Sequence, residues 1–177
     1  MNAALTFIQK NPAQRVAVFV DVSNMYHSAR NIYNSHLDFG AALKAAVGER
    51  QLVRAIAYAI KAESKDEEGF FNALTKQGFE LKVKELQTFA GGAKKGDWDM
   101  GIAIDAIKIA PKVDTVVLVS GDGDYSVLLE HIKTMGCRVE VMAFSESASH
   151  LLLKVADDFT DLSQNRKLFL RRIMRRR

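Results

Sequence analysis

Two runs of β-branched and aromatic residues constrain the fold of this chain more than any other feature. Residues 15–21 read RVAVFVD and residues 115–120 read TVVLVS, and neither run alternates between apolar and polar side chains. Such runs are typical of strands that are buried on both faces, as in a parallel sheet covered by helices. The sequence therefore predicts two central strands, one that ends at Asp21 and one that leads into the turn GDGD at 121–124.

Strand and helix patterns alternate along most of the chain. This order predicts a three-layer α/β/α domain with a mostly parallel central sheet. Ser23 is a candidate cap for the helix after the first strand, and the alternating run 79–86 is typical of an edge strand. Ligands of such domains bind beyond the carboxyl ends of the central strands. The other expected elements are strands over 51–60 and 138–144, and helices over 24–34, 39–47, 66–76, 97–110, 125–135 and 147–155.

The composition argues against several classes of protein. Cys137 is the only cysteine, so no internal disulfide can form, and the apolar run after it predicts a buried thiol rather than a nucleophile. The histidines are scattered and show no zinc-like spacing. No apolar run approaches the ~20 residues that a spanning helix needs, and no signal peptide is evident. We therefore expect a cytoplasmic protein without a membrane span.

Positive charge is concentrated at the C-terminal end. The net charge is +4, but residues 162–177 hold seven Lys and Arg residues and no acid, which leaves −3 for the rest. Arg171, Arg172 and Arg175 recur at helical spacing beside an apolar stripe, so we expect a basic amphipathic helix over 163–177. Such a helix could bind RNA phosphates, lie on an anionic membrane, dock on the body of the protein or form the contact of a homodimer.

Aspartates follow both of the apolar strands. If these strands are neighbours, their ends lie ~5 Å apart, and Asp21 and Asp122 point into the same crevice. Asp124 falls at the start of the next helix, where the helix dipole favours a carboxylate. Asn24 lies three residues after Asp21 and can reach the same crevice as a neutral ligand or an orienting group.

The turn between Ser120 and Asp124 contains two glycines. Gly121 and Gly123 are expected to adopt backbone angles that other residues resist, so that the chain turns sharply while presenting Asp122 outward. Either acidic motif alone could be an ordinary cap or tight turn. Their joint placement at two central strand ends favours a common site.

A cation would resolve the repulsion within such a cluster. Carboxylates that are packed together repel one another, and some of them take up protons. Oxygen ligands without histidine or cysteine are the set that Mg²⁺ or Mn²⁺ prefers. One or two such ions can activate water and stabilise a phosphoryl transition state. The residues therefore predict a divalent-metal site.

Three segments together resemble a known family. VFVDVSNMY near the start, KKGDWDMGIAIDAI in the middle and VVLVSGDGDYSVLLEHIKTMGCRVEV later are similar to the NYN domain, and more narrowly to its LabA-like bacterial branch. The NYN domain belongs to the PIN-like nuclease superfamily. The resemblance covers roughly residues 15–162. It implies a PIN-like domain over 1–162, with a short N-terminal lead, and a metal-dependent ribonuclease site, followed by the basic segment 163–177.

The resemblance also implies roles for single residues. Asp99 matches the aspartate of the family's Lys-Gly-x-Asp segment, although two residues rather than one separate it from Gly96, which makes Asp97 a rival. Asp99 and Asp105 are six residues apart, ~240° around a helix, and cannot both face one ion. Asp99 lies nearer the helix start, where an anion is favoured. The implied set is Asp21, Asp99, Asp122 and Asp124 as metal ligands, Asn24 as an orienting catalytic residue, and Ser120, Asp105 and Asp97 as supporting residues.

Several residues are candidates for contact with RNA. Lys94 and Lys95 lie in the glycine-rich loop AGGAKKG beside the expected site, where they could contact a phosphate or simply be solvated. Trp98 could stack on a base, but an aromatic residue at a helix start more often belongs to the core. In the basic tail, the candidates are Arg171, Arg172 and Arg175.

Three functions compete on these residues. The leading hypothesis is an endoribonuclease that uses Mg or Mn to hydrolyse single-stranded or structured RNA. The second is a non-catalytic RNA- or protein-binding regulatory module on the same fold, since some LabA-like proteins look like regulatory factors. The third is a phosphatase of the haloacid dehalogenase type, which needs Asp-x-Asp after the first strand. Here Ser23 stands where the second aspartate is required, which argues against the phosphatase.

Overall fold

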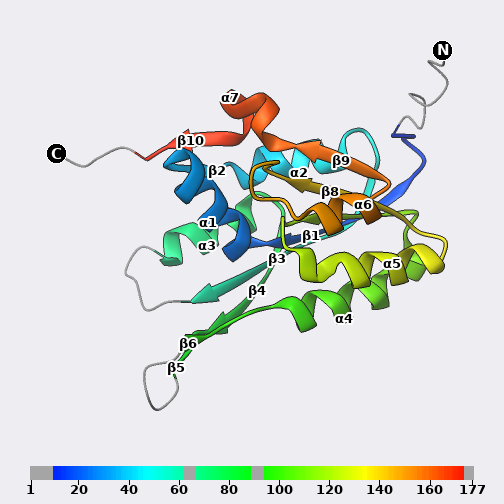
Figure 1. The fold of residues 1–177 in the computed structure, drawn as a ribbon, viewed down its shortest axis with the longest axis horizontal. Coiled ribbons are helices and arrows are strands. Elements are labelled where there is room, and N and C mark those ends of the chain that lie inside the picture. The colour runs from blue at the N-terminus through cyan, green and yellow to red at the C-terminus, as the bar shows by residue number, and fades with distance from the viewer. Residues whose placement is uncertain (1–9, 62–66, 89–93, 174–177) are drawn as a thin grey trace.

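A six-stranded parallel sheet forms the centre of the molecule. The computed structural model describes residues 10–61, 67–88 and 94–173. The strand order is β4-β3-β1-β7-β8-β9, and every neighbouring pair is parallel (Figure 1). The two expected central strands, β1 (Arg15–Asp21) and β7 (Thr115–Val119), are indeed neighbours. The other strands of the sheet are β3 (Gln51–Lys61), β4 (Glu80–Glu85), β8 (Arg138–Ala143) and β9 (Asp158–Asp161).

Helices cover both faces of this sheet, which confirms the three-layer α/β/α fold. Successive side chains of β1 point to opposite faces, so Val16, Val18 and Val20 pack in one core and Ala17 and Phe19 in the other. The first core is closed by α1 (Val22–Tyr33), α2 (Phe39–Val47), α3 (Glu67–Lys76) and the short α7 (Arg166–Phe169). The second is closed by α4 (Asp99–Ile109), α5 (Ser126–Thr134) and α6 (His150–Val155).

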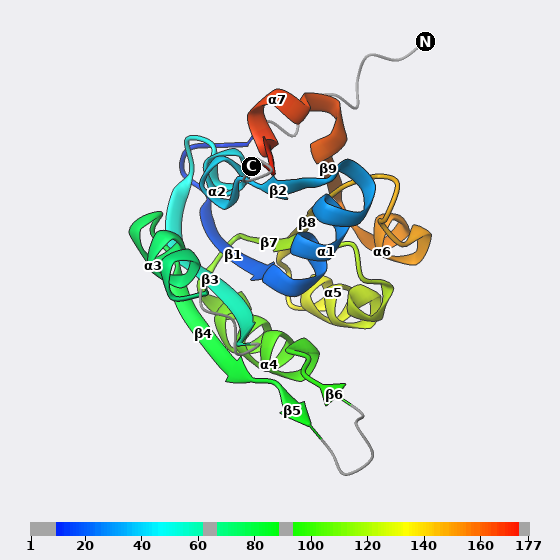
Figure 2. The same ribbon diagram turned by 90° about the vertical axis from the view of Figure 1, so that its left-hand side faces the viewer.

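The carboxyl ends of the strands meet at one edge of the molecule, which faces the viewer in Figure 2. α1 leaves β1 at this edge, and the first turns of α4 and α5 lie beside it. β4 is an edge strand, as expected from its alternating pattern. β9 is the edge strand on the other side of the sheet from β4, and it was not expected from the sequence.

The C-terminal segment differs from the expected basic helix over 163–177. Within residues 163–173, the chain forms the end of a 3₁₀ turn (Leu162–Asn165), the single-turn α7 and the strand β10 (Leu170–Arg172). β10 pairs antiparallel with β2 (Ser35–Leu37), another strand that was not expected. The expectation is wrong for the described part because Phe169 is buried in the first core and its carbonyl accepts from Asp38 N–H at 2.7 Å.

Other expectations fall partly outside the described residues. The N-terminal lead before residue 10, residues 90–93 of the glycine-rich loop and Arg175 lie there. Cys137 is buried, as expected, with its Sγ 3.8 Å from the Val113 carbonyl. Within the described ranges, no helix combines the length and apolarity that crossing a membrane requires.

Candidate metal centre

Asp21 ends β1 and at the same time begins α1. Its Oδ1 accepts from the Asn24 N–H at 3.0 Å, so Asp21, and not Ser23 as expected, is the N-cap of the helix. The amide oxygen of Asn24 in turn accepts from the Gly121 N–H at 3.0 Å. Asn24 thus ties the first turn of α1 to the turn after β7 and keeps the two strand ends together.

The turn after β7 presents two more carboxylates. Asp122 caps a short 3₁₀ turn (Gly123–Tyr125), and its Oδ1 accepts from the Asp124 N–H at 3.0 Å. The Asp122 N–H donates to the Oγ of the fully buried Ser120 at 3.2 Å. These bonds fix the backbone of the turn, so both carboxylates start from a defined position.

The two glycines of this turn are required by space and not by backbone angle. Neither Gly121 nor Gly123 has a positive φ, which corrects the expectation from the sequence. A Cβ on Gly121 would lie 3.0 Å from the Ser147 carbonyl oxygen, and one on Gly123 would lie 2.5 Å from the Ser149 Oγ. The loop before α6 therefore packs directly against the turn.

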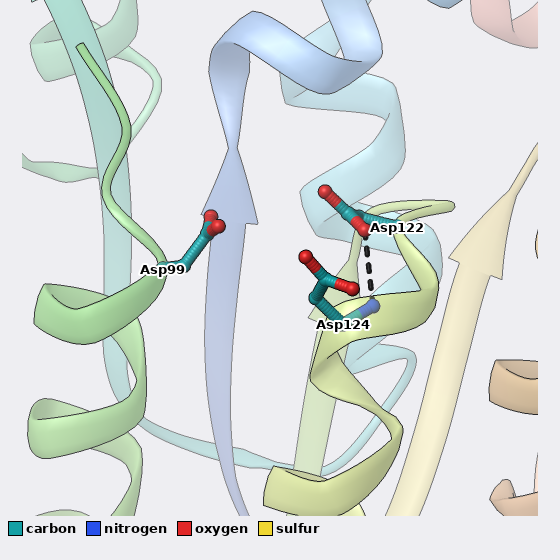
Figure 3. Close-up of side chains that lie close together, drawn as sticks. All are labelled: Asp99, Asp122 and Asp124. Atoms are coloured by element: carbon teal, nitrogen blue, oxygen red, sulfur yellow. Dashed lines mark hydrogen bonds between the residues drawn. The ribbon is translucent and has the colours of Figure 1, made fainter. Parts of the chain in front are cut away.

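Asp99 joins the cluster from a third element. It is the first residue of α4, where the free amides and the dipole of the helix favour an anion. One carboxylate oxygen from each of Asp99, Asp122 and Asp124 lies within 4.8 Å of the others. In Figure 3 the Asp99 side chain points from α4 toward the pair on the turn. Two segments that are distant in the sequence, the start of α4 and the turn after β7, thus place three carboxylates in one small volume, and Asp21 is not among these three.

Tyr125 connects Asp21 to this cluster and was not recognised from the sequence, where it was assigned only to a helix. The phenol is buried, and its oxygen lies 3.1 Å from Asp21 Oδ2 and 2.9 Å from Asp99 Oδ1. A buried tyrosine hydroxyl normally needs a partner, and its position directly after an acidic turn was the available signal. Tyr125 therefore orients two carboxylates with a single hydroxyl.

The surroundings of the site disfavour the ionised form of Asp21 and Asp99 and so raise their pKa values. Burial raises the pKa of Asp21 above its ordinary value, although hydrogen bonds from Asn24 and Tyr125 oppose the rise. Burial also raises the pKa of Asp99, and the charge of Asp122 adds to it. The pKa of Tyr125 is raised strongly, first by burial and then by the two carboxylates it contacts. In all three groups burial is the largest cause, and neighbouring negative charge adds to it.

Among the side chains that the structure describes, which do not include those of Lys94 and Lys95, no basic group supplies compensation for this negative charge. Within that set, no Lys, Arg or His lies within 4.0 Å of the carboxylates of the four aspartates, Asp21, Asp99, Asp122 and Asp124. The donors are hard carboxylate oxygens, which suit Mg²⁺ or Mn²⁺. Both the donor chemistry and the unpaired charge therefore fit a divalent cation.

The structure separates Asp105 from this cluster. Its Oδ2 accepts from the Tyr58 hydroxyl at 2.7 Å and from the Lys82 ammonium at 2.6 Å, on the side of α4 that faces β3 and β4. The pKa of Asp105 is held below its ordinary value because these two hydrogen bonds outweigh the effect of burial. Asp97 is exposed, and its negative charge contributes to the raised pKa of Asp99.

Trp98 belongs to the scaffold of the site. Its indole N–H donates to the Ala59 carbonyl at 2.8 Å, and its ring meets Tyr58 edge-on. The Lys84 ammonium lies 4.3 Å from the ring centroid and donates to the Asp97 carbonyl at 3.0 Å. These contacts attach the start of α4 to β3 and β4, and so they position Asp99.

The basic candidates have different surroundings. Lys94 and Lys95 form the two-residue strand β6, which pairs with β5 (Gln87–Thr88). Arg171 forms an ion pair with Asp38 at 2.6 Å, whereas Arg172 is exposed. Arg171 is thus partly neutralised by a residue of the protein itself.

Comparisons with known proteins agree with the three motifs. Residues 15–163 match the NYN domain. The low amplitude and bright protein LabA of Synechococcus elongatus is 27% identical over 160 residues, which cover 86% of each chain. A protein of unknown function from Vibrio parahaemolyticus has a crystal structure with a TM-score of 0.83 and 38% identity, which covers 93% of this chain and 100% of that one. The resemblance found in the sequence is confirmed, and the chain belongs to the NYN domain family.

Proposed function

We propose that this protein is a metal-dependent endoribonuclease that hydrolyses RNA phosphodiester bonds. The observation that carries the proposal is the cluster of Asp99, Asp122 and Asp124 at the carboxyl ends of the strands, which forms no ion pair with any basic side chain that the structure describes. Such a cluster in an NYN domain fits phosphodiester chemistry better than a purely structural role, because a structural site would not retain uncompensated charge. RNA is the polyanionic substrate that the family suggests.

Asp99, Asp122 and Asp124 would hold Mg²⁺ or Mn²⁺, with Asp21 beside them holding the ion directly or through water. When bound, a divalent ion lowers the pKa of a water ligand and stabilises negative charge on a phosphoryl group. Other residues of the chain hold these carboxylates in position. Tyr125 contacts Asp21 and Asp99, and Asn24 binds the turn that carries Asp122. Asp124 is exposed, which leaves the cluster open to a substrate from solvent.

Cleavage of RNA by purified protein tests the proposal. Single-stranded and hairpin RNA are incubated with Mn²⁺, Mg²⁺ or a chelator, with wild type beside Asp21→Asn and Asp122→Asn. We expect cleavage that needs the metal and is lost in both variants. Glu49→Gln is the matched control. It removes one exposed carboxylate just before β3, at the amino ends of the strands and away from the aspartates.

The other outcomes separate the competing hypotheses. Equal cleavage by wild type and both aspartate variants would identify a contaminating nuclease and contradict the proposal. Binding of RNA without cleavage under any metal condition would favour the non-catalytic module. Hydrolysis of a small phosphomonoester in place of RNA would favour a phosphatase.

A further inference from the structure

A cluster of aromatic rings lies on the surface formed by α1 and β2. The Tyr26 ring stacks on His36, with centroids 5.7 Å apart and planes inclined by 30°. The His27 ring meets the edge of Tyr26 at 5.5 Å. His27 is exposed, and Tyr26 and His36 are half-buried, so the rings are held in place while part of their surface remains accessible.

A cation is built into the same cluster. The Arg30 guanidinium donates to the Tyr26 hydroxyl at 2.7 Å and lies 5.9 Å from the centre of its ring. In the described ranges Arg30 has no carboxylate within 4.0 Å, unlike Arg171, which lies opposite His36 in the β10–β2 pair and binds Asp38. Arg30 therefore retains its capacity to pair with an external anion. We call Tyr26, His27, Arg30 and His36 the ring cluster.

The ring cluster lies next to the acidic site. α1 passes between the first turns of α4 and α5 on one side and the β2–β10 pair on the other (Figures 1 and 2). Asn24 reaches from α1 to the acidic turn, whereas Tyr26 lies on the flank of the helix that contacts β2. Tyr26 is five positions after Asp21, which corresponds to a rise of ~7.5 Å along the helix.

The chemistry of the ring cluster fits a single-stranded nucleic acid. Rings held on a surface offer faces and edges to unstacked bases, and an unpaired guanidinium beside them offers a phosphate contact.

We propose that the ring cluster binds the bases and phosphate of a single RNA strand beside the acidic site. This proposal rests on the proposed ribonuclease function, because it assigns the surface that would hold the strand for cleavage. The strand would cross α1, with one phosphate at the carboxylates and the neighbouring nucleotides on the rings. Duplex RNA, whose bases are stacked inside the helix, would gain little from this surface.

Binding of two labelled strands in the presence of a chelator tests the proposal without cleavage. One strand is oligoadenylate RNA, and the other is an abasic strand of equal length that keeps the phosphates. Tyr26→Leu should weaken binding of the RNA about tenfold and leave binding of the abasic strand unchanged. Arg30→Gln should weaken both strands and reduce the slope of log affinity against log salt by about 0.7.

Two controls protect the interpretation. Tyr26→Phe keeps the ring and should bind RNA as wild type does, and Lys112→Gln removes an exposed charge on another surface and should have no effect. Unchanged RNA binding by both Tyr26→Leu and Arg30→Gln would overturn the proposal, as would equal losses for the two strands in Tyr26→Leu. Cleavage assays on the same variants report the ribonuclease function separately, since that function can stand with the RNA held elsewhere.

Discussion

The hydroxyl oxygen of Tyr125 lies 2.9 Å from Oδ1 of Asp99, inside the protein. The same hydroxyl also contacts Asp21, yet it has a single hydrogen to donate. Only one of the two carboxylates can therefore accept that hydrogen at any moment. Tyr125 therefore links the two acids through one hydroxyl, and the acid that does not hold the hydrogen faces the phenol oxygen at 2.9 or 3.1 Å.

Removal of the phenol oxygen should weaken metal binding. Tyr125→Phe keeps the buried ring but removes the hydroxyl contact from Asp21 and Asp99, so Asp99 loses an orienting partner while Asp21 keeps the bond from the Asn24 N–H. Loss of such a supporting bond typically lowers metal affinity ~10- to 100-fold. Titration calorimetry with Mn²⁺ measures the change in affinity. Tyr26→Phe is the control, because it removes a tyrosine hydroxyl that contacts none of the four aspartates. Wild-type affinity in Tyr125→Phe would contradict the orienting role.

Asp21→Asn should stabilise the metal-free protein at neutral pH. Burial raises the pKa of Asp21 in the folded state, so its contribution to stability is present below the unfolded pKa and is lost as pH rises through the folded value. Asparagine is an equally good N-cap and carries no charge. A gain of ~1 kcal/mol would raise Tm by about 2–4 °C.

The difference in Tm between Asp21→Asn and wild type should depend on pH, and this dependence tests the prediction more sharply than a single value. Thermal unfolding in a chelator should show the gain of Asp21→Asn at pH 7 and little of it below about pH 4, where the unfolded aspartate is itself protonated. Glu49→Gln, an exposed substitution, should show no such trend. A lower Tm for Asp21→Asn throughout the pH range would mean that the Asp21 charge stabilises the fold.

Gly101→Ala should disturb the start of α4. A Cβ at this position would lie 2.5 Å from Cε3 of Trp98, the residue before Asp99. We expect a loss of about 1–3 kcal/mol from overpacking, together with weaker Mn²⁺ binding. Gly69→Ala in α3 is the matched control, because its Cβ would meet nothing within 4 Å, and it should gain about 0.5–1 kcal/mol. Denaturant unfolding of the two variants distinguishes crowding from helix propensity.

Glu140→Gln should destabilise the fold far from the acidic site. The two terminal guanidinium nitrogens of Arg50, Nη1 and Nη2, each donate to Glu140 at 2.9 Å, and both side chains are buried. Removal of the carboxylate leaves a buried unpaired charge, which typically costs about 3–5 kcal/mol. Glu80→Gln breaks the exposed Arg54–Glu80 pair and should cost only about 0–1 kcal/mol. Urea unfolding at pH 7 compares the two variants.

Acid should reduce the difference between wild type and Glu140→Gln. Burial alone would raise the pKa of Glu140, but hydrogen bonds and charge from Arg50 outweigh it and hold the pKa below its ordinary value. The stability from Glu140 is therefore present above the unfolded pKa of about 4.3 and is lost as pH falls through the folded value. A difference that stayed constant into strong acid would argue against the ion pair as its source.

The sequence predicted the parts of the site that depend on local pattern. β1 and β7 are apolar runs without alternation, and each is followed directly by its aspartates, so Asp21 and Asp122 could be placed at one edge. Asp99 was reached only through the family resemblance. Its position depends on how α4 packs, and Trp98 fixes that packing through Ala59, a residue that is distant in the sequence.

The two features that the sequence did not predict, the strand β10 and the role of the Tyr125 hydroxyl, have a common physical cause. The spacing of Arg171, Arg172 and their apolar neighbours fits a helix, but pairing with β2 and burial of Phe169 decide the conformation. Likewise, Tyr125 has the pattern of a core aromatic, and only its neighbours in space reveal the use of its hydroxyl. Contacts between distant segments override local preference in both cases.

The alternation of side chains along β1 has a consequence for how this protein can change. Asp21 follows Ala17 and Phe19 in phase, so its carboxylate lies on the side of α4 and α5, beside Tyr125. Insertion or deletion of one apolar residue within β1 would keep the run hydrophobic but rotate Asp21 to the opposite side of the sheet. Folding would tolerate such a change far better than the cluster would. The number of residues in this strand is therefore as much a part of the site as the aspartate at its end.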